Sequence, residues 1–518
     1  MKSRTGSIWR TLLVLGIVSS VSASHLWAQI PAAQSQGTQA VQLPLSGRAA
    51  QTGSVKATES PVPGTTTSVN TINATVEAQG PYSGSTRGFA NRPFTGRLSF
   101  REAIERGLAY NLGAIGTTQA ANQAHGQVGV SRSALLPNLI GDLAETVQQT
   151  NLKALGVRFN SPIPGFSIPT VVGPFNYIDL RARLSQSIID LTAWNNYKSA
   201  RENLHAAQLS ARDARDLVVL AVGGTYLQVI AAKARVQSAR AQLETANALY
   251  DQATQQRKAG VRAQVDADRS QVQALTQQQR LFSLENDLAK QKIDLARMTG
   301  LSPNDQFDIT DDIPFSPAPV ESLNEILQQA LDSRSDLKAA EIQVRSGERA
   351  MAAARAERLP SLSLNGDYGV IGTNPSQSHG TFSVTGTLRF SIWEGGRIEG
   401  NIEQARAALT QRQAEFEDLK MQLESEVRKA YLDMQAAANQ VAVAGKNVEV
   451  AKETLDLTRQ KVEAGVSESV ELVQSQEALA TAELDYINSV FAHNLAKLTL
   501  ARSTGRAVEV LPRFLNLK

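Results

Sequence analysis

A duplicated turn is the feature that most constrains how this 518-residue chain can fold. One long helical pattern stops at Ala464-Gly465 and another begins almost at once, and the triplet Ala259-Gly260-Val261 repeats this turn 205 positions earlier. Glycine after the last helical residue adopts the left-handed conformation that ends a helix. Each turn therefore predicts a tight reversal between two antiparallel helices, and the chain contains a duplicated unit.

The first residues have the pattern of a secretory signal. Lys2, Arg4 and Arg10 precede an apolar run over residues 11–18, and small residues follow. This pattern predicts a signal peptide over residues 1–28, cleaved after Ala28 or, as the alternative, after Ala23. The run is shorter than the roughly 20 apolar residues of a membrane anchor. No later segment is expected to form a transmembrane helix, so membrane insertion would require another architecture.

Composition excludes several classes of function. The formal charge of +3, with acids and bases interspersed, provides no basic patch for nucleic acid. The absence of cysteine excludes disulfides, thiolate metal sites and cysteine nucleophiles. The five histidines lack metal-ligand spacing, and no phosphate loop, nucleophile elbow or metalloprotease helix occurs. We therefore expect no enzyme, no metal and no cofactor.

Four segments flank the two repeats or join them. Residues 29–95 are rich in Ser, Thr, Gln, Gly and Pro with few large apolar residues, which predicts a disordered, passive extension, with a tether as the alternative. The first repeat is expected over 96–300 and the second over 321–505. An inter-repeat segment over 301–320 and a tail over 506–518 complete the predicted domain organisation.

Within each repeat a helical pattern changes to a strand pattern at a Leu-Pro pair. Pro137 and Pro360 end the predicted helices over 98–134 and 322–358 and mark helix-to-strand elbows. After each elbow the hydrophobic period changes from about 3.6 to 2. The strands recognised in this way cover residues 178–184, 361–370 and 381–393, and a longer loop is expected over 160–175. Such strands also occur in soluble sheets, but their length and the secretory signal favour a membrane barrel.

The longest predicted elements are helices over 191–258 and 397–463, each without proline. Two tracks of heptad spacing run along the second helix, and the first helix repeats them. Their members are Val427, Met434, Val441, Val448, Leu455 and Val462, and Leu423, Ala430, Ala437, Ala444 and Ala451. At 1.5 Å per residue each long helix would extend about 100 Å. The half-length helices over 98–134 and 262–297 would together match it, so the strands and the Ala-Gly-Val turn should occupy opposite ends.

These features together resemble the TolC family of outer-membrane efflux proteins. Both repeats end in similar sequences, Leu295–Gly300 (LARMTG) and Leu500–Gly505 (LARSTG), and the resemblance covers residues 98–505. It implies a mainly α fold with membrane β-strands. Each protomer would contribute duplicated helical hairpins and four strands, and a homotrimer would form a 12-stranded barrel and a periplasmic α-helical tunnel.

The resemblance also implies a function and partners. The chain would be the outer-membrane exit duct of a tripartite efflux pump or type I secretion system in a Gram-negative bacterium. A periplasmic adaptor (membrane fusion) protein would dock at the helical tips, and an inner-membrane RND or ABC transporter would supply energy. The tip residues are Ala259, Gly260, Val261, Ala464, Gly465 and Val466. The alternative is a periplasmic coiled-coil scaffold or adaptor without a pore, against which the duplicated strands argue.

In that family, acidic residues after the second tip ring the tunnel aperture. Counted from the tip, Glu471 falls on the first acidic position, and Gln474 replaces the second. Asp266 and Asp268 are the candidates from the first repeat. A first-turn glutamate also stabilises a helix N-terminus, which is the alternative role of Glu471. The tyrosine and arginine of the family's latch correspond to Val462 and Ser467, which lack that chemistry.

Overall fold

The computed structural model describes residues 53–62, 71–86, 94–154, 156, 169–261, 263–312, 315–317, 322–464, 466 and 469–508. The predicted signal peptide over 1–28 lies outside these ranges. The chain divides into two compact units. The described part of the first unit comprises residues from Asp142–Leu180 and Gly369–Thr381, and the remaining described residues form the second unit.

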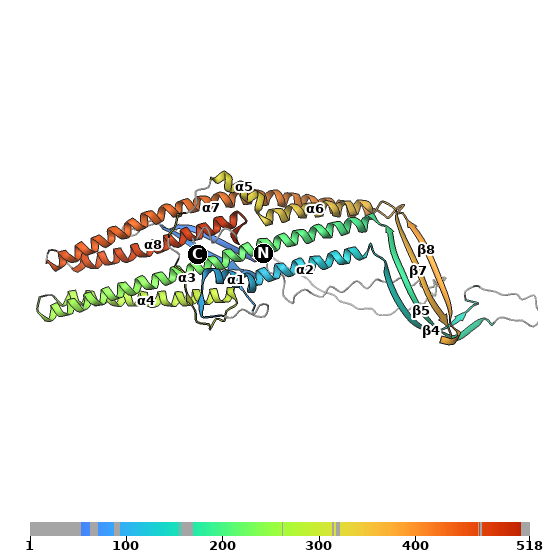
Figure 1. Cartoon of the computed structure of the whole chain (residues 1–518), viewed down its shortest axis with the longest axis horizontal. Coiled ribbons are helices and arrows are strands. Elements are labelled where there is room, and N and C mark those ends of the chain that lie inside the picture. The colour runs from blue at the N-terminus through green and yellow to red at the C-terminus, as the bar shows by residue number, and fades with distance from the viewer. Residues whose placement is uncertain are drawn as a thin grey trace, which may run out of the picture. The chain divides into compact units, whose positions relative to one another are not determined.

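The helices follow the predicted duplicated order (Figure 1). Repeat one contains α1 (Phe100–Tyr110), α2 (Leu112–Ser133), α3 (Leu191–Lys258) and α4 (Gln264–Thr299), and repeat two contains α5 (Leu323–Ser333), α6 (Ser335–Ala356), α7 (Arg397–Glu463) and α8 (Ser469–Ser503). The long helices α3 and α7 contain 68 and 67 residues and match the predicted ranges. The half-length helices before the strands were each expected to be continuous, and both are broken instead.

The first break lies at Asn111 and has a clear cause. The Asn111 side chain accepts a hydrogen bond from the Gly113 backbone N–H at 2.9 Å, which caps α2. Its Nδ2 donates to the Tyr82 carbonyl at 2.7 Å. Because this second bond comes from a segment far away in the sequence, helical periodicity does not predict the break.

The predicted heptad tracks are confirmed as buried seams. In α7, four positions of the first track and four of the second are buried, and these are Val427, Met434, Val441, Val462, Leu423, Ala430, Ala437 and Ala444. The equivalent valines and alanines of α3 are buried as well. The part of each long helix that carries these tracks therefore packs as a coiled coil, as expected for a hydrophobic repeat of seven.

The main core surrounds the middle of α3. Val218, Val222 and Tyr226 are fully buried there, and the Tyr226 hydroxyl bonds to the Leu98 carbonyl at 2.9 Å and to Asp311 Oδ2 at 2.8 Å. This part of α3 corrects the expectation that no later segment is apolar enough to cross a membrane, because α3 passes that test by length and composition. Most of its apolar stretch is buried inside the protein. It is the central core helix, covered by its neighbours.

Four strands form one sheet in the order β4-β5-β7-β8. Their bounds are β4 (Asn138–Asn151), β5 (Val171–Ile189), β7 (Ser361–Gly372) and β8 (His379–Arg389). Pro137 directly precedes β4 and Pro360 directly precedes β7, so both lie at the expected helix-to-strand junctions. Part of the predicted loop over 160–175 belongs to β5, and residues 157–168 lie outside the described ranges.

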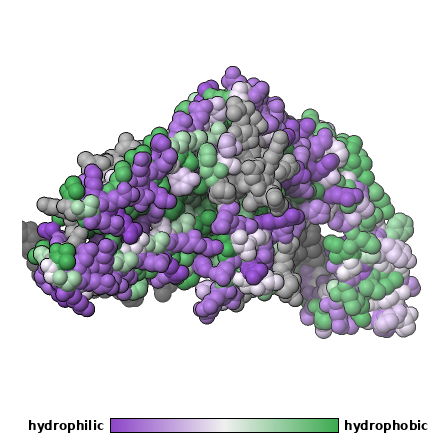
Figure 2. All heavy atoms as spheres, turned by 60° about the vertical axis from the view of Figure 1, so that its left-hand side comes forward, coloured by the Kyte–Doolittle hydropathy of each residue, from purple (hydrophilic) through white to green (hydrophobic). Residues whose placement is uncertain are grey.

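The sheet has the two faces that a period of 2 predicts. On one face Arg181 pairs with Asp367 at 3.0 Å, and the Ser383 hydroxyl bonds to the same carboxylate at 2.8 Å. The neighbours of Ser383 along β8, Phe382 and Val384, are exposed on the other face. Hydrophobic residues therefore gather on the surface of the strands, whereas hydrophilic residues dominate the helices (Figure 2). Such an exposed apolar face suits contact with lipid.

The prediction of disorder for residues 29–95 is wrong where the structure describes them. β1 (Ser54–Val62) and β2 (Thr71–Gln79) pair as an antiparallel hairpin, and η1 (Gly80–Ser83) follows. The hairpin packs against α3 at Gly224, where a Cβ would lie 2.5 Å from Val76 Cγ2. Small side chains and a helical glycine allow close backbone approach, so burial there does not need the large apolar residues that the segment lacks.

The inter-repeat segment also contributes to the fold. β6 (Asp308–Ile309) pairs in parallel with β3 (Arg97–Leu98), which lies at the start of repeat one, just before α1. Lys233 of α3 donates to the Ile309 carbonyl at 3.3 Å. The segment expected as a linker over 301–320 is therefore bound to the core at these residues, and 313–314 and 318–320 lie outside the described residues.

Candidate functional site at the helical tips

Both helical reversals have the same hydrogen-bonded geometry. At the first tip, Gly260 has a φ of 74°, and the Val261 N–H donates to the Gln256 carbonyl at 3.0 Å. At the second tip, the Val466 N–H donates to the Lys461 carbonyl at 2.9 Å. This six-residue closure is the Schellman motif that glycine favours at a helix end. Gly465 and Ser467 lie outside the described residues.

The tips expose apolar side chains that the chain itself does not cover. Val261 is 75% exposed and Val466 is 78% exposed, and each follows the turn glycine directly. A single exposed valine is ordinary on a protein surface. Two valines at equivalent positions of the duplicated tips give a pair of small apolar contact points beside the groove described next.

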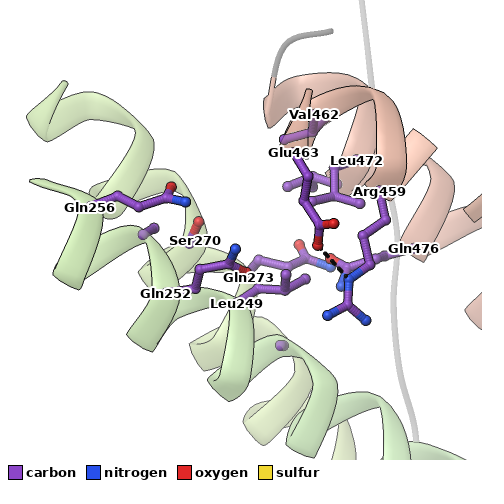
Figure 3. A pocket seen from close by; sticks show the side chains of 13 residues that line it. Leu249, Gln252, Gln256, Ser270, Gln273, Arg459, Val462, Glu463, Leu472 and Gln476 are labelled. Atoms are coloured by element: carbon purple, nitrogen blue, oxygen red, sulfur yellow. Dashed lines mark hydrogen bonds and ion pairs between the residues drawn. The ribbon is translucent and has the colours of Figure 1, made fainter. Parts of the chain in front are cut away.

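A groove separates the two helical hairpins near their tips (Figure 3). Its walls come from α3 and α4 on one side and from α7 and α8 on the other. It is lined by Ala246, Leu249, Gln252, Ala253, Gln256, Ser270, Gln273, Arg459, Val462, Glu463, Leu472, Val473 and Gln476. Ala246 and Ala253 belong to the small-residue track of α3, and their short side chains leave space beside α7 and α8.

The groove is mostly neutral and polar, with apolar patches. Gln252, Gln273 and Gln476 carry amide groups that donate and accept hydrogen bonds. Its one ion pair joins Arg459 Nε to Glu463 Oε1 at 3.2 Å, one turn apart on α7. Such a surface suits a partner helix that presents small apolar and uncharged polar side chains.

Polar contacts join the two hairpins farther from the tips. The Ser238 hydroxyl and the Gln242 amide of α3 donate to Glu483 of α8 at 2.5 and 3.0 Å. Arg280 of α4 pairs with Glu477 of α8 at 3.3 Å. A second hollow adjoins the groove on the side away from the tips and shares Ala246, Gln273 and Gln476 with it, and Gln242 and Glu483 line this second hollow.

Sequence reasoning identified the tip turns but not the groove residues. Among the groove residues, the sequence predicts a role at the tip for Val462 alone, as the counterpart of a latch tyrosine. Val462 is buried in the wall of the groove. The available signal was the alanine track, because small residues in a long seam either admit a close neighbour or leave a groove. Periodicity alone does not distinguish these two outcomes.

The aperture candidates occupy equivalent places in the two repeats. Glu471 is the third residue of α8 and Asp266 the third residue of α4, so both are first-turn acids. Glu471 and Gln474 are exposed, Asp266 is half-buried, and Asp268 accepts a hydrogen bond from Gln264 at 2.7 Å. No cluster that could hold a metal ion is found within the described ranges. These residues remain aperture candidates by position.

Two copies of a long helical hairpin, each joined to a pair of strands with one apolar face, define the fold class of outer-membrane channels with helical tunnels. Residues 117–301 and 326–506 match the model of the outer membrane efflux protein family. The chain therefore belongs to this family, as the sequence resemblance predicted.

Similar proteins agree with this assignment. The chain is 28% identical over 201 residues to Nodulation protein T of Rhizobium leguminosarum bv. trifolii, covering 37% of this chain and 41% of that protein. It is 25% identical over 319 residues to outer membrane protein OprJ of Pseudomonas aeruginosa, covering 59% and 65%. The aligned part of the chain thus spans less than two thirds of these two relatives. A third relative, 23% identical with 62% and 70% coverage, is the pyoverdine export outer membrane protein OpmQ of Pseudomonas putida.

Solved structures show the same fold. The CmeC outer membrane channel of Campylobacter jejuni superposes with a TM-score of 0.68 at 16% identity, covering 79% of this chain and 86% of that chain. The outer membrane protein VceC of Vibrio cholerae gives a TM-score of 0.67 at 16% identity, covering 78% and 96%. The predicted mainly helical fold with long hairpins is confirmed.

Proposed function

We propose that the chain is the passive outer-membrane exit duct of a tripartite export system and acts as a homotrimer. The observation that carries this proposal is a sheet of only four strands with an apolar face and a polar face. An open sheet edge is not tolerated in lipid, and four strands cannot close on themselves. Three chains would supply twelve strands, enough for a closed barrel with a polar interior.

The partners are inferred from the surface of the helical tips and from the need for an external source of energy. The groove between the two hairpins and the exposed Val261 and Val466 form the docking surface for a periplasmic adaptor protein. The sequence carries no nucleotide-binding motif, so an inner-membrane transporter of the RND or ABC type supplies the energy. Similarity to a pyoverdine export protein supports small molecules as the exported class, rather than secreted polypeptides.

The proposal predicts that the purified protein conducts ions. Extracted in detergent and added to a planar lipid bilayer, it should form discrete channels and migrate as a trimer, because the polar sheet face would line a water-filled pore. Single-channel recording and light scattering measure both properties. A protein that remains soluble without detergent and produces no channels would favour the pore-less scaffold.

Replacing Glu471 tests its role at the aperture. In a trimer, three Glu471 carboxylates would surround the pore axis and attract cations. Glu471→Ala should therefore change single-channel conductance roughly two-fold or more and weaken block by divalent cations, because a ring of charge acts on every passing ion. Asp251→Ala removes an exposed acid of α3 that is not an aperture candidate and is the matched control. If both variants behave like the wild type, Glu471 serves only the helix N-terminus.

A further inference from the structure

The β1–β2 hairpin contacts helices of both repeats. It lies against α3 of repeat one and α8 of repeat two, and it precedes the first residue matched by the family model, residue 117. The segment that follows the hairpin is hydrogen-bonded to the break between α1 and α2, where the Leu112 N–H donates to the Gly84 carbonyl at 2.9 Å. Gly113 makes room for the Tyr82 ring, since a Cβ there would lie 2.4 Å from that ring. The hairpin is therefore an integral clasp between the repeats.

One residue on the inner face of this clasp is acidic, whereas its inward neighbours on β1 are apolar. Along β1, Val55 and Ala57 pack against the core, while Lys56 and Thr58 are exposed. Glu59 follows in the inward register. Its Oε2 atom is buried and has no hydrogen-bond partner among the described residues. A carboxylate buried in this way is costly unless it holds a proton.

The nearest charge makes ionisation of Glu59 harder. Burial is the larger cause and the negative charge of Asp433 on α7 is the second, and together they raise the pKa of Glu59 to about 8. Burial also raises the pKa of Asp433, while Lys429 one turn away lowers it. The carboxyl group of Asp433 on α7 is therefore close enough to oppose the ionisation of Glu59.

Basic residues of α3 and α8, the helices that the hairpin contacts, are engaged elsewhere. Lys497 of α8 donates to the Ser316 carbonyl at 2.5 Å, and Arg502 of α8 donates to Asp213 of α3 at 2.5 Å. On α3 itself, Lys233 binds the Ile309 carbonyl. None of these cations contributes to the pKa of Glu59.

We propose that Glu59 makes the N-terminal hairpin a pH-sensitive clasp between the two repeats, which is docked while the Glu59 carboxyl holds its proton and loosens when it ionises. The direction follows from linkage. A carboxyl whose pKa is higher in the docked state than in the undocked state binds its proton more tightly when docked, so docking weakens as pH rises above the ordinary value of 4.5. The weakening stops near pH 8, where the docked carboxyl also ionises. Between pH 6 and pH 9 the docking equilibrium should fall by about 30- to 100-fold.

Hydrogen exchange of the detergent-solubilised full-length protein tests this inference. Peptides that cover residues 54–79 should exchange faster in the wild type than in Glu59→Gln at pH 9, by roughly tenfold or more, and at nearly equal rates at pH 4, where the carboxyl holds its proton in both the docked and the undocked state. Glutamine mimics the protonated carboxyl and does not titrate. The ratio of the exchange rates of the two proteins, taken at one pH, cancels the intrinsic pH dependence of amide exchange.

Glu77→Gln is the matched control, because Glu77 lies exposed on β2 of the same hairpin. It should follow the wild type at both values of pH. Equal exchange in wild type and Glu59→Gln at pH 9 would overturn the proposal. Faster exchange in Glu59→Gln at both values would also overturn it, since Glu59 would then be an ion-pair partner, for example of a second copy of the chain. Either result leaves channel formation, and hence the proposed function, unaffected.

Discussion

Gln273→Trp should abolish export while the channel itself still conducts. Gln273 lies in the wall of the groove between the two hairpins, opposite Arg459 and Gln476 (Figure 3). An indole ring there fills the space that a partner helix needs and removes an amide that would pair with it. Loss of a central contact in a protein interface costs about 2–4 kcal/mol, which is a fall in affinity of roughly 30-fold or more.

The measurement compares two readouts from the same variant. Adaptor recovered with the protein after in-cell crosslinking should fall to background and export should fall with it, whereas conductance in a planar bilayer should stay at the wild-type level. Gln271→Trp is the matched control, because Gln271 is exposed two residues away on the opposite side of α4 and does not line the groove. Normal adaptor recovery with Gln273→Trp would move the docking surface away from the groove.

Much of the fold follows from local sequence signals. The heptad tracks, the absence of proline and the Ala-Gly-Val turns predicted both long helices to the residue, since proline interrupts a helix interior and a turn glycine favours the helix end. The switch to a period of 2 predicted strands over 178–184, 361–370 and 381–393. The first two lie within β5 and β7, whereas β8 ends at Arg389, and no bounds were predicted for β4. These features depend on neighbours within about ten residues, so the sequence contains all the information that they need.

The features that sequence reasoning missed depend on distant partners. Asn111 breaks a helix because the Tyr82 carbonyl binds its side chain, and the hairpin of β1 and β2 is ordered because Gly224 admits Val76. The composition of residues 29–95 predicts disorder, and the helical period gives no sign of a break at Asn111. The groove at the tips was missed for the same reason, because four helices must come together before Ala253 faces an open space.

Removing the Arg502 side chain should cause the largest loss of stability. Arg502 Nη2 donates to Asp213 Oδ1 at 2.5 Å, and the pair joins α8 to α3 where both side chains are largely buried. Arg502→Met leaves the Asp213 carboxylate buried without its partner. Breaking one side of a buried ion pair costs about 3–5 kcal/mol. Thermal unfolding followed by circular dichroism should show a clearly lower midpoint at pH 8.

The pH dependence of the unfolding midpoint distinguishes an unpaired Asp213 carboxylate from simple loss of packing. Burial raises the pKa of Asp213 to about 6, although Arg502 acts in the opposite direction. The stability contributed by its neutral form is therefore present below about pH 4 and is lost as pH rises through 6. Without Arg502 that pKa rises further, so the defect of Arg502→Met should be small at pH 4 and large at pH 8.

Two further variants complete the comparison. Arg428→Met removes an exposed ion pair with Glu424, 2.7 Å long, and should change stability by less than about 1 kcal/mol at either pH. Combining Arg502→Met with Asp213→Leu removes both buried charges and should recover most of the loss, because an apolar pair of similar volume avoids the desolvation cost. A double variant as unstable as Arg502→Met would instead assign the loss to packing of the arginine stem.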